Sequence, residues 1–94
     1  MDKEMLKKNK GTVIESFYYL LEYGVRVLLD ESEINKIKES YSHFCKRANK
    51  SNYYLEQRLR RLNGAIELAK LSYPDLIDVL SEVLQKKNNK NVER

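Results

Sequence analysis

Apolar residues recur in steps of three and four along most of this chain, and this spacing predicts amphipathic helices. One proline and three glycines stand among the 94 residues, so the turn residues that a many-stranded sheet needs are scarce. A chain of this length forms one domain, because shorter pieces would bury too small a core. The sequence therefore predicts a single all-α domain.

Four helical segments follow from the apolar pattern and from the residues that can cap helix ends. They are predicted at about 12–28, 31–48, 52–70 and 74–86. The residues expected to cap them are, in order, Thr12, Asp30, Ser51, and Ser72 or Tyr73. Short connections between such helices favour an antiparallel up-down four-helix bundle, spanning residues 12–85. The lysine-rich residues 1–11 are predicted to be a flexible leader, and residues 87–94 a disordered basic tail.

Glycine and tyrosine positions give expectations about the core and the surface. Gly24 lies within the apolar stripe of the first segment, so its expected role is close packing between helices, although glycine costs about 1 kcal/mol in helix propensity.

The tyrosines divide between core and surface. Tyr18 and Tyr41 fit the core stripes. The tyrosines expected on the surface are Tyr19, Tyr23 and Tyr53. Exposed tyrosine is enriched at protein interfaces, which favours a binding module.

Chemistry-bearing side chains are few. The single histidine, His43, lies away from the apolar stripe of its helix and is expected to be solvated. The single cysteine, Cys45, borders that stripe and is expected to be a small core residue, with a reactive thiol as the alternative. No phosphate-binding loop, nucleophile elbow or metal-ligand spacing occurs. We therefore predict no catalytic residue, no metal site and no cofactor.

The strongest charge feature is the stretch from Cys45 to Arg61, which holds six cations, two adjacent tyrosines and one glutamate. The candidate partner-binding residues are Lys46, Arg47, Lys50, Tyr54, Arg58 and Arg61, with Lys86, Lys87 and Lys90 of the tail. Helical spacing places Arg58 and Arg61 on one flank, beside the buried stripe. Such a patch suits phosphate contact or docking on a protein or membrane surface. The alternative is a solvated face whose arginines pair with acidic residues of neighbouring helices.

Location follows from what the sequence lacks. One cysteine permits no intramolecular disulfide, and no uncharged run approaches the roughly 20 residues that a membrane span needs. Charged residues interrupt the only apolar stretch that resembles a secretion signal, and no cleavage site follows it. We therefore expect a cytoplasmic protein without a transmembrane segment.

Several stretches together resemble one protein family. They are "VIESFYYLL" near the start, "DES" at Asp30–Ser32, and above all "LEQRLRRLNGAIELA" from Leu55 to Ala69. The matching positions in the last stretch are Leu59, Arg61, Leu62, Asn63, Ile66 and Ala69. This pattern is similar to the small immunity proteins of the enterocin A type, which protect producers of class IIa bacteriocins. The chain departs from that family in a shorter link before its last helix and in a C-terminal end without aromatic residues.

The resemblance implies a four-helix bundle without catalytic activity. It implies action inside the cell on a membrane sugar transporter that carries bound bacteriocin, with specificity held largely in the C-terminal half. The basic tail would be attracted to the anionic inner leaflet. The alternatives are a small phage or plasmid regulator that binds nucleic acid, or an inhibitor of one specific protein, through the basic stretch. Self-association as a homodimer is also open, because the narrow apolar stripe of 31–48 could continue across a two-fold axis.

Overall fold

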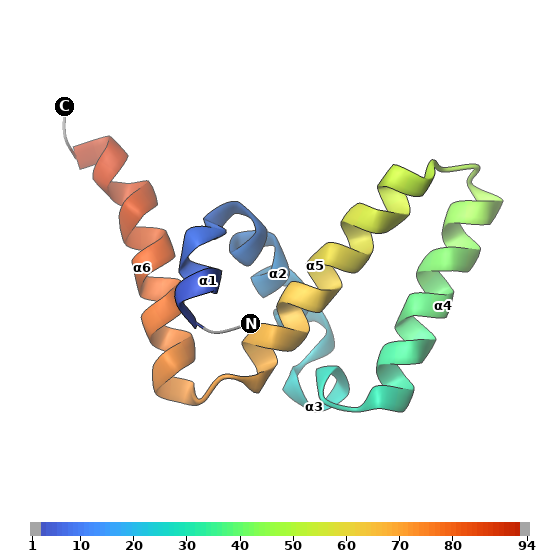
Figure 1. Ribbon diagram of the computed structural model, residues 1–94, viewed down its shortest axis with the longest axis horizontal. Helices are drawn as coiled ribbons and strands as arrows, with labels where there is room; N and C mark the ends of the chain where they lie inside the picture. Colours follow the sequence, from blue (N-terminus) through green and yellow to red (C-terminus); the bar gives the residue numbers. More distant parts are fainter. Residues whose placement is uncertain (1–2, 93–94) are drawn as a thin grey trace.

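The computed structural model describes the backbone of residues 3–92 and the side chains of residues 3–85. Within this part of the chain all regular structure is α-helical, which confirms the all-α prediction (Figure 1). The helices are α1 (Lys3–Lys8), α2 (Lys10–Tyr23), α3 (Val25–Leu28), α4 (Glu31–Arg47), α5 (Asn52–Lys70) and α6 (Tyr73–Val92).

Three of the four predicted helix starts are confirmed by their caps. Asp30 Oδ1 accepts hydrogen bonds from the backbone amides of Ser32 and Glu33 in the first turn of α4, at 2.9 and 3.3 Å. Ser51 and Ser72 each accept from the amide three residues ahead, at 3.2 and 3.4 Å. Thr12, by contrast, lies inside α2, so its predicted capping role is wrong. A capping residue needs a non-helical backbone so that its side chain can reach the first amides of the helix. Thr12 is already inside α2, which begins at Lys10.

Gly24 divides the predicted first helix into α2 and α3. Its backbone has φ 86° and ψ 156°, a conformation that glycine adopts far more readily than any residue with a side chain. Apart from its two chain neighbours, no described residue has an atom within 4 Å of the position that a Cβ at Gly24 would occupy. The expectation that Gly24 serves close helix packing is therefore wrong. That role belongs to Gly64 on α5, which faces Ser16 on α2.

The first residues of the chain are helical and packed, so the predicted flexible leader at 1–11 is wrong for the residues that the structure describes. Leu6 is buried with an exposed fraction of 2%. Lys3 and Lys7 place their Nζ atoms 3.2 and 3.0 Å from Asp78 Oδ2 on α6. The sequence pattern gave no sign of this packing, because the carboxylates that Lys3 and Lys7 meet on α6 are about 70 residues away in sequence.

The end of α6 also differs from expectation. The helix continues to Val92, beyond its predicted end at residue 86, so the backbone of 87–92 is helical where a disordered tail was expected. Residues 93–94 lie outside the described part of the chain.

The helices pack around α5, which contacts α2, α3 and α4, while α6 packs against α1 and α2. Figure 1 shows α4 and α5 as an antiparallel pair that leads away from α1 and α6. The radius of gyration is 14.8 Å, whereas a compact domain of this length has about 12.4 Å. The arrangement is thus open, and the predicted up-down bundle topology is not confirmed.

Candidate functional site

The predicted basic residues separate into two groups in the structure. Lys46, Arg47 and Lys50 are exposed around the turn between α4 and α5, where Asn49 takes a left-handed backbone conformation with φ 54°. Arg58 and Arg61 lie further along α5 and contact other helices of the same chain.

Arg58 is surrounded by aromatic rings. Its Nε and Nη2 donate hydrogen bonds to the Tyr54 hydroxyl, at 3.2 and 2.8 Å. Its guanidinium carbon lies 5.3, 5.5 and 5.9 Å from the ring centroids of Tyr54, Tyr41 and Phe44. The hydrogen bond with Tyr54 raises the pKa of Arg58, so the side chain is a permanent cation between α4 and α5. Arg58 therefore serves the packing of these two helices.

Arg61 forms an ion pair with Glu15 of α2, Nε to Oε2. This pairing corresponds to the alternative in which the arginines of this stretch meet acidic residues of neighbouring helices. Arg58 and Arg61 therefore do not share one solvent-facing patch. The predicted candidates Lys86, Lys87 and Lys90 lie outside the described side chains.

The exposed residues at the end of the α4–α5 pair form what we call the α4–α5 tip: Phe44, Lys46, Arg47, Lys50 and Tyr53. Phe44 and Tyr53 are 43% and 69% exposed. No carboxylate lies between Glu39 and Glu56 in the sequence. The tip therefore combines three cations with two accessible aromatic rings.

Three tyrosines were assigned to the wrong side of α2. Tyr18 is 64% exposed, whereas Tyr19 and Tyr23 pack onto the core. Tyr23 shares a 2.9 Å hydrogen bond with the hydroxyl of Tyr41, and the Tyr19 ring meets both of these rings edge-on. Burial raises the pKa of Tyr41, which stays protonated. The predictions for Tyr41 as core and Tyr53 as surface are confirmed.

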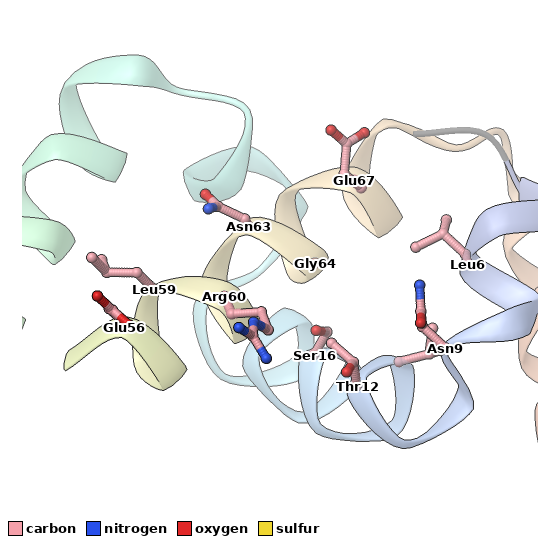
Figure 2. A pocket seen from close by; sticks show the side chains of 11 residues that line it. Leu6, Asn9, Thr12, Ser16, Glu56, Leu59, Arg60, Asn63, Gly64 and Glu67 are labelled. Atoms are coloured by element: carbon pink, nitrogen blue, oxygen red, sulfur yellow. The ribbon is translucent and has the colours of Figure 1, made fainter. Parts of the chain in front are cut away.

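A groove lies between α1 and α2 on one side and α5 on the other (Figure 2). Its volume is about 780 Å³, within the usual range of ligand clefts. The side chains around it carry two carboxylates, a guanidinium, amides and hydroxyls. The residues that line it are Leu6, Asn9, Thr12, Val13, Ser16, Glu56, Leu59, Arg60, Asn63, Gly64 and Glu67. Ser16, at its base, is fully buried against Gly64, so the groove offers charge and hydrogen bonding only at its walls.

The remaining chemistry-bearing residues lie where they were predicted. Cys45 is buried and His43 is exposed. Among the described residues, no group of three or more histidine, cysteine, aspartate or glutamate side chains could hold a metal ion. In the same part of the chain, every helix is too short or too polar to cross a membrane.

Comparison with known proteins gives no relative: no family model, curated protein or solved structure matches this chain.

Proposed function

We propose that this protein is a non-catalytic, cytoplasmic interaction protein that meets an anionic surface through the α4–α5 tip. In its sharpest form, the proposal is a bacteriocin immunity protein that acts at the inner face of the membrane on a receptor–bacteriocin complex. The observation that carries it is the placing of three exposed cations and two exposed aromatic rings at the end of a projecting helix pair.

The chemistry of the α4–α5 tip fits the surface of an anionic bilayer. A lysine or arginine close to such a surface contributes about 1 kcal/mol, and aromatic rings such as that of Tyr53 favour the interface. Three cations therefore contribute about 3 kcal/mol, which holds a protein at a membrane only transiently. A protein receptor in the membrane would supply the remaining affinity, which is why we favour a receptor complex over lipid alone.

The family resemblance gives the proposal its biological form. The stretch that carries it, Leu55–Ala69, lies within α5. In this proposal α2, α4, α5 and α6 stand for the four helices of the enterocin A immunity type, with α1 as an addition.

The test is survival of a class IIa-sensitive strain that expresses the protein. Protection is expected, and it should fall when the cations of the α4–α5 tip are removed together in the variant Lys46→Gln, Arg47→Gln, Lys50→Gln. A matched control removes three exposed cations elsewhere: Lys8→Gln, Lys38→Gln and Lys70→Gln. The control should keep its protection. If the unaltered protein gives no gain in survival, the immunity version of the proposal is wrong.

The lipid contact can be measured separately by co-sedimentation with vesicles. Binding to vesicles that contain phosphatidylserine is expected to be weak, to decrease with added salt, and to be absent on vesicles of phosphatidylcholine alone. Equal binding to both vesicle types would contradict a role for the cations.

Nucleic acid is the second candidate partner, because the same three cations could meet phosphates while Tyr53 stacks on a base. It is less favoured, since Arg58 and Arg61 are engaged within the chain. Retardation of single-stranded DNA or RNA at low salt, with a steep loss of affinity as salt rises, would favour it. Co-purification of one protein without polyanion affinity would instead favour a specific inhibitor.

A further inference from the structure

A second surface, formed by α2 and α6, is apolar and lies apart from the α4–α5 tip. On α2, Tyr18 and Leu21 are 64% and 65% exposed; on α6, Ile77 and Leu84 are 44% and 52% exposed. Tyr18 and Leu84 line one cavity, and Leu21 and Ile77 lie one and two helical turns from them along α2 and α6. Single exposed hydrophobic residues are ordinary, but a patch of them marks an interaction site. We call these four residues the α2–α6 face.

The α2–α6 face contains a hole. Its volume is about 150 Å³, a size at which an apolar cavity can hold a benzene ring. The residues that line it are Ile14, Phe17, Tyr18, Leu80, Val83 and Leu84. Leu21 is not among them, but it stands one helical turn beyond Phe17 on the same side of α2. The face therefore presents a hole and, next to it, the exposed side chain of Leu21, which is small enough to enter such a hole.

We propose that the α2–α6 face is the contact between two copies of this chain, related by a two-fold axis. Such a contact requires a surface that complements itself, so that residue i meets residue j and j meets i. Leu21 of each copy enters the hole of the other, and Leu84 at the edge of that hole is covered. The described residues that line the hole carry no charge, so like charges do not meet at its centre.

The surface area also favours a second copy. The chain exposes 6792 Å², whereas a compact monomer of 11.2 kDa exposes about 5,700 Å². The excess is roughly 1,100 Å², and a standard stable interface buries about 800 Å² on each partner. The excess of exposed surface over a compact monomer is therefore as large as one side of a standard interface.

The first experiment measures mass by sedimentation velocity over a range of protein concentrations. A concentration-dependent dimer is expected. Leu21→Asp should weaken it by roughly 30-fold or more in dissociation constant, as for a central interface residue. The control is Tyr53→Asp, because Tyr53 is similarly exposed, at 69%, but belongs to the α4–α5 tip. A monomer at every concentration, or a dimer that Leu21→Asp leaves unchanged, would overturn the proposal.

The second experiment tests the geometry and does not require a disruptive change. In a Cys45→Ala background, a Leu21→Cys chain is mixed with a Leu84→Cys chain and oxidised. The self-complementary contact predicts a disulfide between the two different chains, formed faster in the mixture than in either chain alone. If the protein dimerises but the mixture shows no such preference, Leu21 does not enter the hole. Circular dichroism of each variant confirms that the helices are retained.

Discussion

Ser16 on α2 packs against Gly64 on α5 so closely that residue 64 has no room for a side chain. A Cβ placed there would overlap Ser16 Oγ and lie 3.1 Å from Ser16 Cβ. Ser16 is fully buried, and its hydroxyl has no hydrogen-bond partner among the described residues. The distance between α2 and α5 at this contact therefore depends on the small side chains of both residues.

Replacement of this glycine tests the contact. Gly64→Ala is expected to lower the free energy of unfolding by about 1–3 kcal/mol, because overpacking forces the helices apart. Urea denaturation followed by circular dichroism gives the value. Gly11→Ala is the control: Gly11 also lies in a helix but has open space around it, so stability should rise by up to about 1 kcal/mol. Equal effects of the two changes would contradict the close contact.

The partner residue allows a double-mutant cycle. Ser16→Ala removes a buried hydroxyl without a partner, so it is expected to be neutral or stabilising. Combined with Gly64→Ala, it should recover part of the lost stability, because the overlapping oxygen is gone. Strict additivity of the two changes would show that Ser16 and Gly64 do not interact.

Gly24 is required for its backbone conformation, whereas Gly64 is required for the space that it leaves. Gly24→Ala meets no neighbouring atom, yet it should destabilise the protein by about 1–2 kcal/mol, because φ 86° is strained for alanine. The same denaturation experiment measures this. If Gly24→Ala instead stabilised the protein as Gly11→Ala does, α2 and α3 would be one continuous helix in solution.

The aromatic surroundings of Arg58 predict that lysine cannot replace it. Arg58→Lys keeps the charge but loses the planar group that lies over three rings and donates twice to Tyr54, so a loss of about 1–2 kcal/mol is expected. Tyr54→Phe should lose only the hydrogen-bonding part. Arg60→Lys is the control, since Arg60 is exposed, and it should change stability by less than about 0.5 kcal/mol. Similar effects at Arg58 and Arg60 would contradict the packing role.

The contact between α1 and α6 should respond to acid. Hydrogen bonds from Lys7 and Lys3 hold the pKa of Asp78 below its usual value of about 3.9. The contribution of this carboxylate is therefore complete above about pH 4, and it is lost as the pH falls through the lower pKa of the folded protein. Amide hydrogen exchange of α1 should accelerate over that window before α5 is affected. Asp78→Asn should make exchange in α1 fast already at neutral pH; unchanged exchange would show that other contacts hold α1.

Three of the four predicted helix caps were read correctly from the sequence because they depend on near neighbours. Asp30, Ser51 and Ser72 accept from amides two or three residues away, so these caps need no tertiary structure. The burial of Tyr41 and Cys45 follows from the spacing of apolar residues along one helix. The cations of the α4–α5 tip lie at a turn, where side chains are exposed in almost any arrangement of helices.

What one sequence determined here is the class of fold and the starts of α4, α5 and α6, since hydrogen bonds within a helix and its caps join residues close along the chain. The tertiary structure decided how each glycine is used, which side of α2 is buried, and where Arg58 and Arg61 point. These outcomes depend on contacts between residues far apart, such as Ser16 with Gly64 and Arg61 with Glu15. A stripe of apolar residues shows that a helix has a partner, but the identity of that partner is fixed only when all the helices pack at once.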